Sequence, residues 1–217
     1  MNPVEFGIQQ AYELSKNLDR IENYPLELID EWGAIDAKVI DELAQSNSLN
    51  MVFCRSQLID SFNEIRMEGL ISDFEGIDYL YTEPRLPIIS KRMLSVLRNV
   101  RDFPHQIIPA VIEDMEMASF GDLNRSGRVN TDYVALQLLK QLDIFDRENS
   151  VYSPSSISPR GIGRIEKLVL KVPDQGLPPI FRITEKSTRL YVSPEAKAAL
   201  EEAEITGINF VDINFDD

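Results

Sequence analysis

The chain has 217 residues, 43% of them hydrophobic, enough for one sizeable core or two small ones because a chain of this length buries roughly 70% of its unfolded surface. Asp and Glu outnumber Lys and Arg by 36 to 22, and the formal net charge is −14. Nucleic acids and anionic membranes attract clustered basic residues, so this balance excludes both as expected partners and favours a basic protein.

The acidic residues concentrate at the start of the chain. Residues 1–50 hold ten acidic and three basic residues, a net charge of −7. A solvated surface is one explanation, since runs of charge often only keep a protein soluble. The other is an acidic face that attracts a basic partner. For this second explanation, the candidate partner-binding residues are Asp30, Glu31, Trp32, Asp36, Asp41 and Glu42.

Trp32 is the candidate anchor of that face, because tryptophan is enriched among the residues that contribute most to binding energy. Packing in the core is the alternative for this side chain. Tyr24-Pro25 and Trp32-Gly33 interrupt any continuous helix. We expect residues 1–80 to form an acidic, mostly helical N-terminal region, with residues 81–217 as an α+β domain packed with it into one compact unit.

Apolar residues between Leu58 and Met67 have near-helical spacing and predict a helix that ends at Gly69. The single cysteine, Cys54, stands in an apolar run and is expected to be a small buried hydrophobe. The first residues lack the pattern of a signal peptide, and no run of about 18 apolar residues follows. We therefore expect a cytoplasmic protein.

An apolar-serine pattern occurs twice, at Leu86–Ser90 and, 103 positions later, at Arg189–Ser193. Each serine precedes a helical segment and then a short apolar run. A serine oxygen accepts a hydrogen bond from the first helical turn, so each copy predicts a strand, a capped helix and a strand. Gly207 suits the exit from the second helix. The two segments are either duplicated units or a chance repeat of a common pattern.

The segment between these copies predicts further elements. Residues 133–142 form an apolar run that favours a buried helix. Alternating residues predict strands at 165–172 and 180–183, and a loop is expected at 153–159. The expected fold class is α+β, a mixed sheet with helices.

The sequence contains no clear enzymatic motif. His105 is the only histidine, and its setting before an apolar run favours a structural role over that of a catalytic base. Residues 113–116 hold three carboxylates, which we interpret as a solvated helix start. Asp122 to Gly127 resembles half of a calcium loop, but Tyr133 stands where a glutamate is required. We expect no catalytic residues, no metal and no cofactor.

The C-terminal part of the chain resembles a known family. The residues are Pro179–Ile183, Arg189–Ser193, Ala199–Ala203 and Ile205–Phe210, with weaker similarity at Asn130–Tyr133, Leu142–Asp146 and Ile165–Leu170. This order of strand, serine-capped helix, Thr-Gly turn and last strand resembles immunity-protein family eleven of bacterial polymorphic toxin systems. The resemblance covers roughly residues 80–215.

The resemblance implies a non-catalytic protein that binds and neutralises a cognate toxin. Because we expect the chain itself to be cytoplasmic, we also expect that toxin to act in the cytoplasm. It transfers no catalytic residues and does not identify the toxin, whose surface is expected to be basic. Two other functions stay open. One is an adaptor or chaperone for a secreted effector, and the other is an enzyme that reverses the toxin's product.

Overall fold

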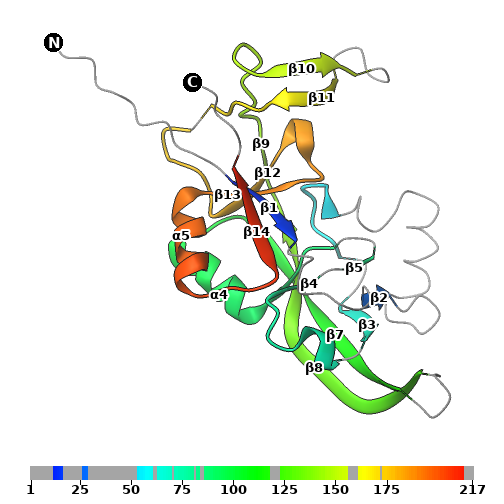
Figure 1. Ribbon diagram of the computed structural model, residues 1–217. Helices are drawn as coiled ribbons and strands as arrows, with labels where there is room; N and C mark the ends of the chain where they lie inside the picture. Colours follow the sequence, from blue (N-terminus) through cyan, green and yellow to red (C-terminus); the bar gives the residue numbers. More distant parts are fainter. Residues whose placement is uncertain are drawn as a thin grey trace.

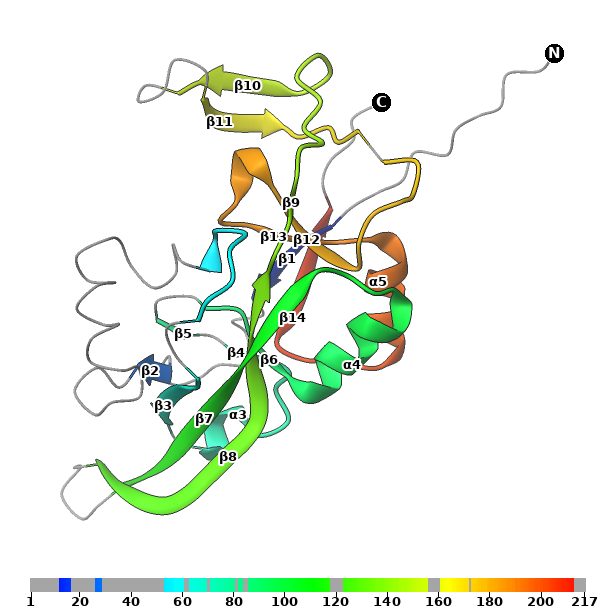
Figure 2. The same cartoon turned by 180° about the vertical axis from the view of Figure 1, so that it is seen from behind.

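The fold is built around a long antiparallel ribbon formed by β7 (His105–Met117) and β8 (Leu123–Leu138). In the computed structural model, the described residues are 12–16, 26–28, 53–60, 63–69, 71–80, 82–83, 86–117, 123–155, 161–171 and 173–212. The far end of the ribbon extends well past the helices in both views (Figures 1 and 2).

The ribbon is the centre of the larger mixed sheet, whose strand order is β4-β6-β8-β7-β3-β2-β5. The short helix α3 (Ile71–Phe74) follows β3 and lies beside β7. The other strands of this sheet are β2 (Leu26–Leu28), β3 (Ile65–Gly69), β4 (Tyr79–Leu80), β5 (Thr82–Glu83) and β6 (Ile88–Ser90).

The smaller mixed sheet has the order β14-β1-β13-β12-β9. The short helix η2 (Thr184–Lys186) follows β12. The strands of this sheet are β1 (Tyr12–Lys16), β9 (Gln141–Leu142), β12 (Ile180–Ile183), β13 (Leu190–Val192) and β14 (Ile208–Asp212). A separate ribbon of β10 (Val151–Pro154) and β11 (Ile162–Lys167) lies at the end of the molecule opposite the tip of β7 and β8 (Figure 1).

The two segments with the repeated serine pattern have the same topology. In the first, β6 leads through α4 (Lys91–Val100) to β7, and both strands are antiparallel to β8, which lies between them. In the second, β13 leads through α5 (Pro194–Glu202) to β14, with β1 between them in the same way. Each segment is therefore a parallel strand-helix-strand unit split by one antiparallel strand.

Both predicted serine caps are confirmed. Ser90 Oγ accepts the Met93 N–H at 3.0 Å, and Ser193 Oγ accepts the Ala196 N–H at 3.2 Å. The helices α4 and α5 lie side by side (Figures 1 and 2). The buried face of α4 and that of α5 share one hydrophobic cluster, which includes Leu97 and Leu200. The expected α+β fold class is confirmed, with helices packed on mixed sheets.

Residues 133–142 do not form the predicted helix, because they continue β8 and then form β9. The reason is that residues 133–138 of β8 are buried on both faces. Tyr133 and Ala135 lie in one core cluster, whereas Val134 and Leu136 lie in another on the opposite face. A strand covered on both sides is a continuous apolar run, which periodicity cannot distinguish from a buried helix.

Three other expectations about local structure were wrong. The helix predicted around Leu58–Met67 is not formed in its described part, because residues 58–60 have no regular secondary structure and Ile65 and Met67 belong to β3. Ile65 and Met67 are buried in the core, whereas Leu58 is 69% exposed. Residues 113–116 belong to β7 rather than to a helix start. The expected loop at 153–159 begins inside β10, and residues 156–159 lie outside the described part. Strand pairing across the sheet overrides local spacing here.

The other two predicted strands are present. β12 has the predicted bounds, 180–183. β11 covers the start of the segment expected at 165–172 but begins earlier, at Ile162, and ends at Lys167.

The N-terminal region is joined to both sheets. β1 pairs with β13 and β14, and β2 pairs with β3 and β5. The described parts of residues 1–80 contain more strand than helix, and the rest of the region expected to be mostly helical lies outside the described residues. Helices in the described part of the chain are all too short or too polar to cross a membrane.

Side-chain amides hold the segment at residues 53–60 against the sheet. Gln106 accepts the Ile59 N–H at 2.8 Å and donates to the Ile59 carbonyl at 2.6 Å, as a neighbouring strand would. Gln137, which is fully buried, donates to the carbonyl oxygens of Arg55 and Gln57. These contacts position the segment without a regular strand pairing.

Candidate functional site

The residues predicted to contact a partner all lie outside the described residues. They are Asp30, Glu31, Trp32, Asp36, Asp41 and Glu42. The hypothesis that this acidic segment attracts a basic partner therefore stays a prediction. The candidate site in the described part of the chain is in a different place.

A groove of about 470 Å³ lies along one edge of β8. Residues 128–133 of β8 form one wall, and residues 75–78 with Ser90 and Arg92 form the other. The pairing of β6 with β8 ends at Ser90 and Tyr133. Among the described residues, no strand pairs with this edge farther out, so the groove continues the line of β6.

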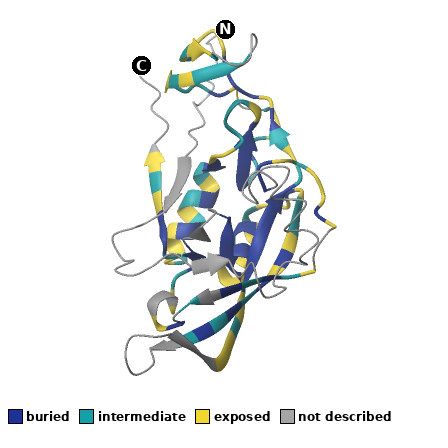
Figure 3. Cartoon of the chain, turned by 90° about the vertical axis from the view of Figure 1, so that its right-hand side faces the viewer, coloured by how far each residue is buried: buried dark blue, intermediate teal, exposed yellow. Residues whose placement is uncertain are grey.

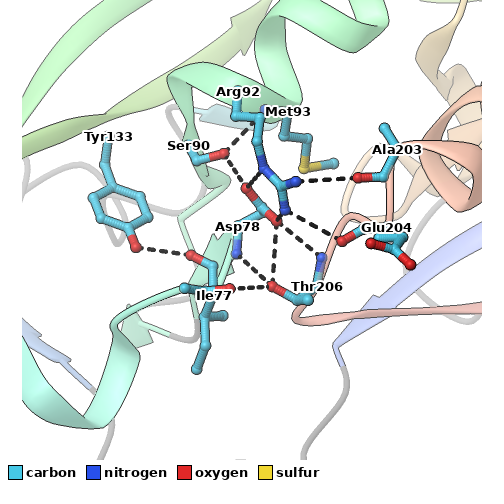
Figure 4. A network of polar contacts seen from close by, with 10 residues as sticks. Ile77, Asp78, Ser90, Arg92, Met93, Tyr133, Ala203, Glu204 and Thr206 are labelled. Atoms are coloured by element: carbon cyan, nitrogen blue, oxygen red, sulfur yellow. Dashed lines mark hydrogen bonds and ion pairs between the residues drawn. The ribbon is translucent and has the colours of Figure 1, made fainter.

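Asp78 is the centre of a polar network at one end of the groove (Figure 4). Its Oδ1 accepts the Ser90 hydroxyl at 2.5 Å and Arg92 Nε at 3.1 Å. Its Oδ2 accepts Arg92 Nη2 at 2.5 Å and the Thr206 N–H at 3.0 Å. The Thr206 hydroxyl donates to the Gly76 carbonyl at 2.5 Å and accepts the Asp78 N–H at 3.2 Å.

The same network binds the end of α5. Arg92 Nη1 donates to the Ala203 carbonyl at 3.1 Å, and Nη2 donates to the Glu204 carbonyl at 3.2 Å. Carbonyl groups at a helix C-terminus lack partners within the helix and carry partial negative charge, which a guanidinium stabilises. Arg92 therefore connects the first strand-helix-strand unit to the second.

These contacts fix the charge of Asp78. Burial alone would raise the pKa of this carboxyl, but the hydrogen bonds from Arg92, Ser90 and Thr206 outweigh burial and hold the pKa below its ordinary value of 3.8. Both oxygens are already occupied by donors. A general base needs a free lone pair directed at its substrate, so this geometry suits a structural counterion better than a catalytic group.

Tyr133 lies on the β8 wall and donates its hydroxyl hydrogen to the Ile77 carbonyl at 2.7 Å. Burial raises the pKa of this phenol, and the carboxylates of Asp78, Asp132 and Glu75 raise it further. The hydroxyl therefore stays protonated.

His105 has the structural role that we expected. Its Nδ1 lies 2.7 Å from the Phe103 carbonyl, and its ring stacks on the Phe103 ring with 4.3 Å between centroids. The Arg98 guanidinium contacts Nε2 at 2.8 and 3.1 Å. A guanidinium can only donate, so Nε2 is the acceptor and Nδ1 carries the hydrogen bonded to the carbonyl. Both ring nitrogens are engaged.

Cys54 is buried, with 3% of its surface exposed, as predicted for a small hydrophobe. Burial raises the pKa of its thiol, and the nearby Arg182 guanidinium opposes this effect. The thiol form is therefore favoured, which makes Cys54 a poor nucleophile.

Sequence reasoning missed the Asp78 network. The partners of Asp78 are 12, 14 and 128 residues away along the chain. The Thr206-Gly207 turn is part of the family resemblance, but no sequence pattern predicts the hydrogen bonds between Thr206 and Asp78. In the described part of the chain, no three His, Cys, Asp or Glu side chains are arranged to hold a metal ion.

The chain is therefore an acidic α+β protein with a projecting two-stranded ribbon and a polar groove along one edge of β8. No family model matches the chain, and no curated protein is similar enough to count as a relative.

Proposed function

We propose that the protein is an immunity protein, which binds a basic protein toxin of the cytoplasm in a one-to-one complex and blocks it without catalysis. The proposal joins the resemblance at the C-terminal strand, capped helix and Thr-Gly turn to the acidic charge of the chain. Its toxin is expected to be encoded beside its gene, as for members of the family that it resembles.

The observation that carries the proposal is the open edge of β8 on a projecting ribbon. β7 and β8 extend past the helices, and the far part of β8 carries exposed residues at Gly127–Val129 (Figure 3). Val129 is 54% exposed in the middle of this strand. A strand edge beside which no further strand is described can pair with the backbone of a partner chain.

A surface of this kind can bind a toxin with the affinity that protection of the cell requires. A nanomolar dissociation constant corresponds to about −12 kcal/mol, and an interface of roughly 1,600 Å² provides this when a few central residues pack well. The Asp78 network supports the proposal indirectly, since it stiffens one wall of the groove and leaves less conformational entropy to lose on binding.

The test is a titration of the purified toxin with the purified chain, together with survival of bacteria that express the toxin with and without it. An immunity protein abolishes toxin activity near one equivalent and restores growth. Tight binding with full toxin activity would replace the proposal by the adaptor function. Protection at far below one equivalent would indicate the enzyme that reverses the toxin's product.

A further inference from the structure

The groove exists because β6 ends early. Ser90 is the last residue of β6 and also the cap of α4, so the chain turns away from the sheet at this point. β8 continues outwards from Tyr133 to Leu123, and β7 covers only its other edge. The space that the next residues of a longer β6 would occupy is the groove.

The backbone of β8 faces this space at Asp132. The Asp132 N–H is bonded at 2.8 Å to Oδ1 of Asn130, a local side chain, in an exposed position. Between Tyr133 and Asn130, β8 advances three residues while β7 advances two, from Ala110 to Ile112. This bulge interrupts the regular pairing of β8 with β7 and bends β8 beside the groove.

The charge of the groove identifies the partner's chemistry. Asp78 is neutralised by Arg92, and Arg128 forms an ion pair with Asp114 at 3.5 Å. The exposed carboxylates of Glu75 and Asp132 add negative charge on opposite walls. Both carboxylates act electrostatically on the Tyr133 hydroxyl, so a lysine or arginine side chain in this part of the groove would be attracted by both.

We propose that the groove takes an extended, lysine- or arginine-bearing segment of the toxin, which pairs with residues 128–132 of β8 and continues the sheet beyond β6. The exposed side chain of Val129 gives the segment an apolar contact on the ribbon, and the basic side chain lies between Glu75 and Asp132. This inference rests on the proposed function, because the segment belongs to the toxin.

Hydrogen exchange of the full chain, with and without the toxin encoded beside its gene, tests the location. The expected result is slower exchange of the amides at 128–132 in the complex. If the toxin binds and is inhibited but protection appears only elsewhere, the inference is overturned and the proposed function stands. If the toxin does not bind at all, both fail together.

Charge reversal tests the chemistry of the segment. The variants Asp132→Lys and Glu75→Lys are expected to bind the toxin at least tenfold more weakly than the unmodified chain. The matched control is Glu166→Lys, an exposed charge reversal on β11 of the separate ribbon. Its affinity for the toxin is expected to lie within twofold of that of the unmodified chain. All three positions are exposed, so folding is preserved, and equal affinity of the Asp132 and Glu75 variants would overturn the inference.

Discussion

At the scale of single residues, Asp78 links segments that are far apart in the chain. Its carboxylate binds the start of α4 through Ser90 and Arg92, and the turn after α5 through Thr206. The carboxylate is buried, whereas the guanidinium of Arg92 is half exposed. Removing a buried partner of a charged group leaves unsatisfied donors behind, which costs more than the net gain from the pair.

We therefore expect Asp78→Asn to lower the free energy of unfolding by about 2 kcal/mol, measured by urea denaturation. The control is Glu201→Gln, which removes the exposed ion pair between Lys197 and Glu201 on α5 at 2.6 Å. The free energy of unfolding of that variant should be close to that of the unmodified chain, because exposed ion pairs contribute little to stability. Equal losses in the two variants would show that the Asp78 network does not stabilise the fold.

The stabilising effect of Asp78 should depend on pH in a definite direction. Its pKa in the folded state lies below the ordinary value of 3.8, so the unfolded chain binds a proton more readily. The contribution of the Asp78 carboxylate to the free energy of unfolding is complete above the pKa of Asp78 in the unfolded chain. It is lost as the pH falls through the pKa of Asp78 in the folded protein. The difference in the free energy of unfolding between the unmodified chain and Asp78→Asn, measured in urea, should be constant above about pH 5 and should narrow in acid. A difference that widens in acid would contradict this.

At the scale of elements, the two helix caps have the same geometry but different surroundings. Ser193 only caps α5, whereas Ser90 caps α4 and also donates to Asp78. Ser193→Ala should therefore lower the free energy of unfolding by about 1 kcal/mol, and Ser90→Ala by about 2 kcal/mol. Thermal or urea unfolding measures both, and a larger loss for Ser193→Ala would contradict the assignment.

The turn after α5 gives a second prediction at this scale. Gly207 has a φ of 81°, and a Cβ there would lie 2.5 Å from the Tyr79 carbonyl oxygen and 2.6 Å from Cγ2 of Ile77. Gly127 has the same φ of 81° with no atom within 4 Å of such a Cβ. We expect Gly207→Ala to lower the free energy of unfolding by about 3 kcal/mol and Gly127→Ala by about 1 kcal/mol. Equal losses in urea would mean that backbone strain, not the close approach, dominates.

At the scale of the whole molecule, the net charge of −14 should act on association with a basic partner. Raising the salt concentration from about 0.01 M to about 1 M shortens the screening length from about 30 Å to about 3 Å. The association rate with the toxin, followed by stopped-flow fluorescence, should then fall more than tenfold, while the dissociation rate changes less. An association rate that is insensitive to salt would remove electrostatic steering from the proposal.

The candidate site was only partly accessible to sequence reasoning. Acidic charge predicted a surface for a basic partner, but the residues chosen for it lie outside the described part of the chain. The groove depends on where β6 stops relative to β8, and Asp78 depends on Thr206, 128 residues away. Neither the position where β6 ends nor the contact between Asp78 and Thr206 produces a local residue pattern in the sequence. Both depend on contacts between segments that are far apart in the chain.

Local sequence patterns were enough to predict the capped helices, the strand at 180–183, the burial of Cys54 and the α+β class, because caps, turns and strong periodicity act over a few residues. Long-range pairing was needed to place residues 133–138 and 141–142 in strands, and to show that β1 splits the second unit as β8 splits the first. In each case, burial on both faces or pairing with a distant strand outweighs the local preference of the chain.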